Sequence, residues 1–186
     1  KHQSIYGFNN ADERFLTYAD KLFDFNNFSW AKSQLTMSFR LTNQISDFIN
    51  SCVIKENRIR TTNKEGEKPK YIYCDTYGIG PFNCVKEYLE KGYNPDDIFI
   101  LAPSVRNGTP IRKLENKIKI HLPDIPIYVP NNDDEKINDV VVAGKIVIST
   151  YHQTKGLERK IVFIFSFDDL YFEFYCKNKR KDICPN

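Results

Sequence analysis

The most specific group of chemically capable side chains is the polar stretch 149–158, which reads Ser-Thr-Tyr-His-Gln-Thr-Lys-Gly-Leu-Glu between two hydrophobic segments. Hydroxyls, His152 and Lys155 at the end of a strand can bind a phosphate backbone, and Gly156 allows a close approach. Glu158 can accept a hydrogen bond from a ribose hydroxyl. Taken singly, His152 is more often a structural histidine, and Lys155 with Glu158 more often a solvated pair. Their joint occurrence favours a nucleotide or nucleic-acid contact.

A second group, Ser38-Phe39-Arg40, places an aromatic ring and then a guanidinium at the end of a predicted strand. A positioned arginine neutralises the charge that develops on a transferring phosphoryl group and accelerates hydrolysis by ~10³–10⁵. The neighbouring ring can stack on adenine. The alternative is a surface arginine paired with a carboxylate, which for these three residues alone is the commoner case.

A third group, in residues 3–11, sets the amide of Gln3 beside two aromatic residues, Tyr6 and Phe8. A nucleic-acid base that stacks on such a ring contributes about 1–3 kcal/mol and does so for any base sequence. The alternative is that Tyr6 and Phe8 are ordinary core aromatics.

Alternating strands and helices are expected to position these groups. Apolar runs and alternation predict strands at 34–39, 71–74, 98–102, 125–129, 145–149 and 161–167. Helical spacing predicts helices at 10–25, after a cap at Thr42, at 81–92 and at 109–120, with loops at 55–70 and 131–139. This order favours an α/β fold with a parallel sheet and right-handed crossovers. Ligands bind such sheets beyond the carboxyl ends of the strands, here after Phe39, Ala102 and Ser149.

Composition narrows the class of protein without settling its partner. The 186 residues fit one soluble globular domain, since no apolar run approaches the ~20 residues of a membrane helix. A net charge of +3 is too small to establish a nucleic-acid partner. Five cysteines without a CxxC pair argue against a zinc site and favour a reducing intracellular compartment, cytoplasm or nucleus. Heavy use of Asn, Lys, Ile, Tyr and Phe suggests an AT-rich source, as in some viruses and parasites.

The three groups together resemble the UvrD/PcrA/Rep group of superfamily 1 helicases. Residues 3–12 are similar to motif III, residues 35–40 with Ile45 and Asn50 to motif IV, and residues 148–158 to motif V. The resemblance implies that 1–186 is a single RecA-like domain, the 2A domain of a helicase. Such a domain is a three-layer α/β/α structure with a mostly parallel sheet, a P-loop NTPase-like fold that here lacks the P-loop itself.

The resemblance also implies roles in an ATP site, each carried over only where a motif matches. Gln3 would sense the γ-phosphate and Phe39 would stack on adenine. Arg40 would be the arginine finger. Gly156 and Glu158 would face the ribose and phosphates of the nucleotide.

For single-stranded DNA, the resemblance implies that Tyr6 and Phe8 stack on bases. Thr150 and His152 would lie near the strand's backbone, with Lys155 as a phosphate contact. The chain departs from the family pattern at Asn9, where arginine is usual, and at Phe39, where tyrosine is usual. About a hundred residues separate motifs IV and V, so the large 2B insertion of the long helicases is expected to be absent.

The chain carries no GxxxxGK[ST] phosphate loop, no acidic magnesium-binding pair and no motif VI. We therefore expect ATP with Mg²⁺ to be shared with the first RecA-like domain of the same polypeptide, which would hold most of the metal. This piece alone is expected neither to hydrolyse ATP nor to unwind a duplex. Movement from 3′ to 5′ follows only by analogy with the family.

Two other functions stay open. The chain could be a catalytically idle DNA-binding or interaction module, derived from a helicase, within a DNA repair or replication complex. It could also be an unrelated flavodoxin-like or Toprim-like domain, whose marker would be carboxylates at strand ends. Asp168-Asp169 is the one candidate for such a marker, and the start of a helix explains that pair better.

Overall fold

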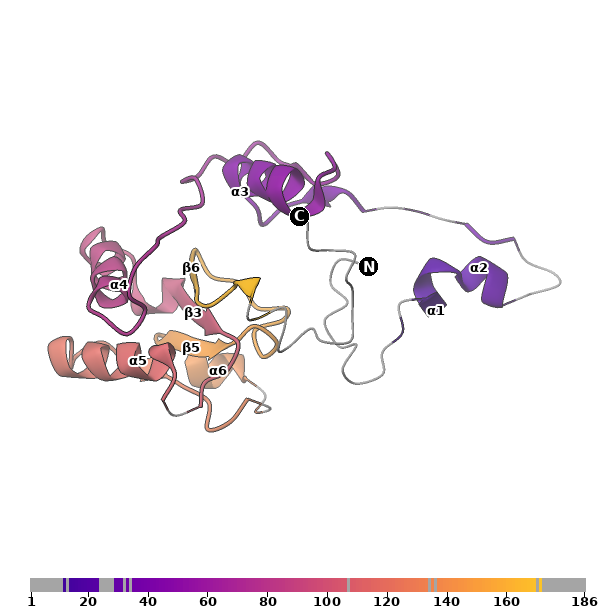
Figure 1. Ribbon diagram of the computed structural model, residues 1–186. Coiled ribbons are helices and arrows are strands. Elements are labelled where there is room, and N and C mark those ends of the chain that lie inside the picture. The colour runs from indigo at the N-terminus through magenta and orange to yellow at the C-terminus, as the bar shows by residue number, and fades with distance from the viewer. Residues whose placement is uncertain are drawn as a thin grey trace. The chain divides into compact units, whose positions relative to one another are not determined.

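The computed structural model describes residues 12, 14–23, 29–31, 33, 35–106, 108–133, 135, 137–169 and 171. Gln3, Tyr6, Phe8 and Asn9 therefore lie outside the described residues. The chain divides into two compact units, 1–73 and 74–186, and each is described by itself (Figure 1). The expectation of a single domain over 1–186 stays a prediction.

The first unit begins with two short helices, α1 (Arg14–Thr17) and α2 (Ala19–Leu22), where the sequence predicted one helix over 10–25. Tyr18 separates them because its backbone, at φ −117° and ψ 24°, leaves the helical region. The amide of Leu22 nevertheless donates to the carbonyl of Tyr18, at 2.9 Å. The helical periodicity was therefore real in the described part, but the helix is broken in two.

A small parallel ladder and a helix follow. Strand β1 (Met37–Ser38) pairs with β2 (Arg60–Thr61), and helix α3 (Asn43–Phe48) continues into the π-helix η2 (Ile49–Ile54). The predicted cap is confirmed, since Thr42 Oγ1 accepts a hydrogen bond from the Ile45 amide, at 3.4 Å.

The prediction of a loop over 55–70 was wrong at β2. This strand is too polar to show as an apolar run, and the side-chain amide of Asn50 holds the chain beside it. The Ile59 amide donates to Asn50 Oδ1 at 3.0 Å, and Asn50 Nδ2 donates to the Ile59 carbonyl at 2.8 Å. A predicted strand at 71–74 is also wrong: the residues form no strand, and Tyr71 and Tyr73 are almost fully exposed.

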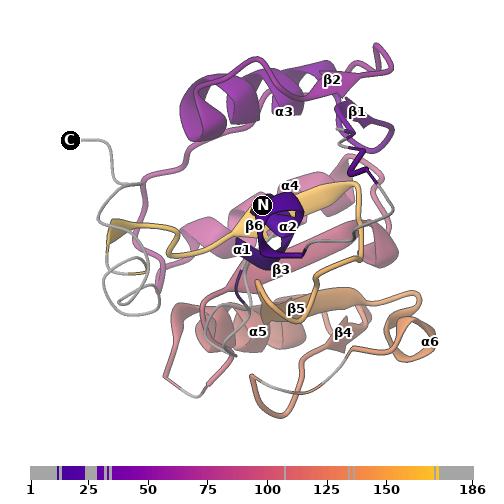
Figure 2. The ribbon, with the colours of Figure 1, turned by 90° about the vertical axis from the view of Figure 1, so that its right-hand side faces the viewer.

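The second unit is built on a four-stranded parallel sheet in the order β4-β5-β3-β6 (Figure 2). Its strands are β3 (Ile98–Ala102), β4 (Ile127–Tyr128), β5 (Ile146–Thr150) and β6 (Ile161–Ile164). They confirm four of the strands predicted from apolar runs. The two central strands, β3 and β5, are buried almost throughout, as parallel strands covered on both faces must be.

Helices cover both faces of this sheet. Helix α4 (Gly80–Glu90) and helix α5 (Pro110–His121) confirm the helices predicted at 81–92 and 109–120, and each has a proline in its first turn. Their apolar faces pack with one side of β3 and β5 in a shared core of Phe82, Val85, Ile98, Ile100, Ala102, Ile111, Leu114, Ile118, Ile146, Ile148 and Phe165.

Across the sheet, Val142 of the short helix α6 (Asp139–Val142) packs on Phe99 and Val147. A 3₁₀ turn, η3 (Pro95–Asp97), leads into β3. The fold is a mixed α/β structure with a parallel sheet, consistent with the predicted RecA-like, P-loop-NTPase-like class. Among the described helices, none is long and apolar enough to cross a membrane.

Candidate functional site

The carboxyl ends of β3 and β5 lie side by side at one edge of the sheet. Ala102 pairs with Thr150, and the amide of Tyr151 donates to the Ala102 carbonyl at 3.3 Å. Residues 151–156 then form a turn, which we call the β5 turn. The sequence expected ligand-facing segments after Ala102 and after Ser149, and the structure places both at this edge.

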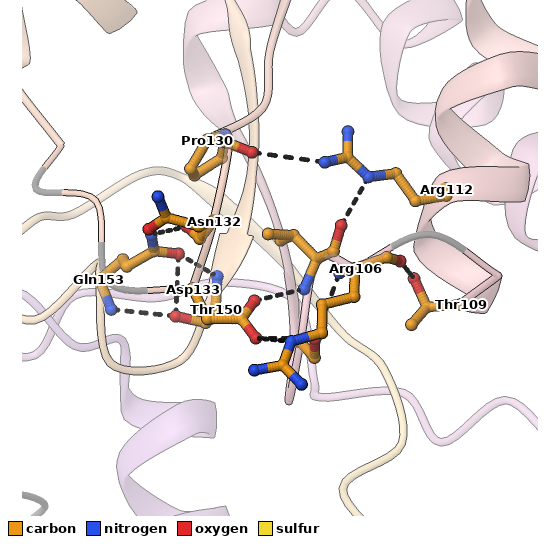
Figure 3. A network of polar contacts seen from close by, with 10 residues as sticks. Arg106, Thr109, Arg112, Pro130, Asn132, Asp133, Thr150 and Gln153 are labelled. Carbon is orange, nitrogen blue, oxygen red and sulfur yellow. Dashed lines mark hydrogen bonds and ion pairs between the residues drawn. The ribbon is translucent and has the colours of Figure 1, made fainter.

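Gln153 is the hub of the β5 turn, although the sequence did not single it out. Its Oε1 accepts hydrogen bonds from Ser149 Oγ, the Thr150 amide and Thr150 Oγ1, at 2.9, 3.0 and 2.9 Å. Its Nε2 donates to the Asn132 carbonyl at 2.9 Å (Figure 3). The same nitrogen donates to the Glu135 carbonyl, also at 2.9 Å. A glutamine in a polar run carries no signal of such a role, because its two partners in the loop stand about twenty positions away.

Two of the predicted DNA contacts, Thr150 and His152, are buried to different extents. Thr150 is 1% exposed, and its hydroxyl bonds to Gln153. His152 is half-buried, and burial lowers the pKa of its imidazole, which favours the neutral ring at pH 7.

The remaining predicted residues of the stretch face solvent. Lys155, Gly156 and Glu158 are all exposed. Gly156 adopts φ +93°, a left-handed conformation that favours glycine, and a Cβ built there would meet nothing within 4 Å. A ligand can therefore approach the backbone at Gly156 without obstruction from the described residues.

A second cluster lies at the end of β3, where the sequence analysis had named no motif. Ser104 Oγ donates to Asp133 Oδ2 at 2.9 Å, and the Val105 amide donates to Asp133 Oδ1 at 2.8 Å. The largely exposed guanidinium of Arg106 lies 3.2 Å from Asp133 Oδ2 (Figure 3). Asp133 belongs to the same loop as Asn132 and Glu135. Residues 130–135, which we call the bridging loop, thus contact the ends of both β3 and β5.

Arg112 supports this edge from α5. Its Nε donates to the Val105 carbonyl at 2.5 Å, and its Nη2 donates to the Pro130 carbonyl at 3.4 Å. Its Nη1 bonds to the buried carboxylate of Glu115 at 2.8 Å, and Lys119 bonds to the other oxygen at 2.6 Å. Burial opposes ionisation of Glu115, but Lys119 and Arg112 outweigh it, so the pKa of the carboxyl is lowered.

Two ion pairs fix the chain beyond Glu158. Arg159, 11% exposed, pairs with Asp96, and its guanidinium carbon lies 5.3 Å from the centre of the Phe99 ring. Lys160 pairs with Asp97 at 2.9 Å, and this hydrogen bond lowers the pKa of the Asp97 carboxyl. Glu158 therefore stands exposed next to a segment that is anchored to the turn before β3.

In the first unit, Phe39 and Arg40 follow β1 directly. Phe39 is 76% exposed and Arg40 is exposed, so both side chains are accessible to a ligand. Asn50, part of the motif IV resemblance, is buried and bonded to backbone beside β2. Its contacts are structural.

Carboxylate clusters give little support to the alternative α/β enzymes. Asp168 Oδ1 accepts a hydrogen bond from the Tyr171 amide at 3.1 Å, the i to i+3 pattern of a helix start. No group of three His, Cys, Asp or Glu side chains in the described parts of the chain is arranged to hold a metal ion.

Comparison with known proteins adds one similarity. The chain is 29% identical over 178 residues to a protein of Acanthamoeba polyphaga mimivirus named "Putative ATP-dependent DNA helicase R568". This similarity supports a helicase relationship. It covers 89% of the chain and 24% of the viral protein, so the chain spans about a quarter of that relative's length. No protein-family model matches the chain, and neither does any solved structure.

Proposed function

We propose that the chain is the second motor domain of a UvrD-type superfamily 1 ATP-dependent DNA helicase, one RecA-like domain over 1–186. The observation that carries the proposal is the β5 turn. A motif V-like sequence stands at the carboxyl edge of a parallel sheet, where ligands bind such folds. The helicase similarity over 89% of the chain supports the same conclusion.

Among the described residues of the proposed ATP half-site, Phe39, Arg40, Gly156 and Glu158 are exposed. The exposed ring of Phe39 would stack on adenine, and Arg40 would neutralise charge at the γ-phosphoryl group. Gly156 and Glu158 would meet the ribose and phosphates, and Gln3 would sense the γ-phosphate. Bound ATP supplies the phosphoryl group that is transferred to water. Most Mg²⁺ ligands would come from the first RecA-like domain.

The proposed DNA track runs over the β5 turn. Exposed Lys155 offers a positive charge to a phosphate, and neutral His152 offers a hydrogen bond. Thr150 would lie near the same DNA backbone, and its hydroxyl stabilises the β5 turn by a hydrogen bond to Gln153. Tyr6 and Phe8 would stack on bases.

The second candidate is a catalytically idle DNA-binding or interaction module of a repair or replication complex. It is favoured by the missing phosphate loop, because the 186-residue chain has no lysine in a GxxxxGK[ST] context to grip the phosphates of a nucleotide. A phosphate loop elsewhere in the full-length protein would favour the motor.

Replacing Arg40 by alanine in the full-length protein tests the motor. We expect ATPase turnover to fall by ~10³-fold or more while nucleotide binding is retained. Arg60→Ala, at an exposed arginine of β2, is the matched control and should keep the unmutated rate. Unchanged DNA-stimulated turnover in Arg40→Ala would remove Arg40 from the mechanism. An unmutated protein without any ATPase would favour the idle module.

A further inference from the structure

The bridging loop contacts the end of β3 through Asp133 and the β5 turn through Gln153. On one side, Asp133 bonds to Ser104 and Val105 after β3. On the other side, the carbonyls of Asn132 and Glu135 bond to Gln153 in the β5 turn. Among the hydrogen bonds of the described residues, those of Gln153 link this loop to the turn.

The orientation of the Gln153 amide is fixed by its partners. Its oxygen faces three donors, and its nitrogen faces two carbonyl oxygens, so each of the two N–H bonds has an acceptor. The opposite orientation would set an N–H group against the Thr150 amide N–H and the side-chain oxygen against two carbonyl oxygens. The site is therefore built for a neutral amide, which no carboxylate or apolar side chain reproduces.

Glu135 is itself held in place. Tyr128 Oη donates to Glu135 Oε1 at 2.7 Å, and the amide and side chain of Asn131 donate to Oε2 at 2.7 and 3.0 Å. These bonds tie the loop to β4. The carbonyl that receives Gln153 thus belongs to a braced segment, and this is what allows one side chain to orient the turn.

We propose that Gln153 is a positioning residue that locks the β5 turn to the bridging loop and so presents His152 and Lys155 to the backbone of single-stranded DNA. This inference rests on the proposed function. Gln153 acts through the turn, whereas Lys155 and His152 make the contact. Glu158 is held independently, because Arg159 and Lys160 anchor its segment to the turn before β3. Loss of the lock should therefore affect DNA more than ATP.

The test is Gln153→Glu in the full-length protein. Glutamate keeps the length and the acceptor oxygens, but it loses both N–H donors and sets a negative charge against two carbonyls. We expect the DNA concentration that half-saturates ATPase stimulation to rise by about tenfold or more. The KM for ATP should change by a smaller factor, because Glu158 is anchored through Arg159 and Lys160, although Gly156 lies in the β5 turn itself.

Two further variants keep this test decisive. Asn83→Asp makes the same amide-to-carboxylate change at an exposed position of α4 and should leave DNA stimulation unchanged. Ser149→Ala removes one of the three donors to Gln153 and leaves the rest, so it should fold and shift DNA half-saturation in the same direction by a smaller factor. A general loss of all activities in parallel would overturn the positioning role.

Hydrogen exchange of the full-length protein gives a readout that needs no activity. In Gln153→Glu, the amides of 131–133, 135 and 150–154 should exchange faster, while those of β3 keep their protection. Unchanged exchange in both segments would overturn the lock. If the unmutated protein shows no DNA-stimulated ATPase, the proposed function fails, and faster exchange at both segments would still show the lock itself.

Discussion

Burial controls the charge state of the His152 side chain. Because burial lowers the pKa of His152 below the ordinary histidine value of 6.5, the unfolded chain takes up a proton at higher pH than the folded chain. The stability that neutral His152 contributes is therefore full above about pH 6.5 and is lost as the pH falls toward the lower, folded pKa. A neutral imidazole also suits a hydrogen-bonding contact better than an ionic one.

We predict that His152→Gln reduces the loss of stability between pH 7.5 and pH 5.5. Glutamine cannot protonate, so this part of the acid sensitivity disappears. Urea unfolding at both pH values measures the effect, and His121→Gln, at an exposed position of α5, is the control. An equal loss in His152→Gln and the unmutated protein would contradict the prediction.

The types of residue in the sequence were enough to locate the candidate site. The part that each side chain plays there depends on its hydrogen-bond partners, which the sequence does not show. The polar stretch 149–158 could be placed at a strand end because hydrophobic runs flank it. The hub at Gln153 could not be predicted, since it depends on the carbonyls of Asn132 and Glu135 in a distant loop. The burial of Thr150 follows from its place at the end of the buried strand β5, which the sequence had ended at Ser149. The roles of Arg40, Phe39 and Glu158 remain predictions.

At the scale of elements, the connection from β5 to β6 is held by Arg159. Its guanidinium is largely buried, pairs with Asp96, donates to the Val142 carbonyl at 3.3 Å and covers the Phe99 ring. We predict that Arg159→Ala lowers the free energy of unfolding by about 1–3 kcal/mol, since it removes a charged hydrogen bond and a cation–π contact.

The matched control is Lys160→Ala. The Lys160 side chain is mostly exposed in its pair with Asp97, so its removal should cost at most about 1 kcal/mol. Chemical denaturation of the three proteins side by side measures the difference. A cost for Lys160→Ala as large as that for Arg159→Ala would contradict the anchoring role of Arg159.

Elements were predictable where burial follows the sequence pattern. Strand β3 is a continuous apolar run and β5 begins with three apolar residues, while α4 and α5 carry apolar faces with proline at the start. Strand β2 was not predicted, because the Asn50 side-chain amide, rather than apolar packing, holds the chain beside this strand. Residues 71–74 are a short run of strand-forming residues, yet Tyr71 and Tyr73 are almost fully exposed.

At the scale of the whole molecule, the alternation of strands and helices predicted the α/β class because parallel strands need crossover helices. The helicase relationship is supported by one similar protein, and the chain covers about a quarter of that protein's length. Short motifs describe the chemistry of a few neighbouring residues and not the arrangement of a whole domain. The UvrD-type assignment, the single domain and the absent 2B insertion therefore remain predictions.

We predict that the 186-residue chain by itself hydrolyses no ATP, with or without single-stranded DNA. An arginine finger accelerates transfer only when another surface holds the nucleotide, and the chain has no phosphate loop. Phosphate release by the purified chain measures this, with the full-length protein as the positive control. Turnover that persists through purification and disappears in Arg40→Ala would contradict the prediction.

The strand order β4-β5-β3-β6 also governs how the chain can fold during its synthesis. Strand β3 leaves the ribosome first of the four, yet both of its neighbours, β5 and β6, are made later. Until they emerge, its hydrophobic residues and its unpaired backbone groups have no partner in the sheet. Closure of such long-range pairs is slow, so nascent chains that end before β5 should depend on chaperones.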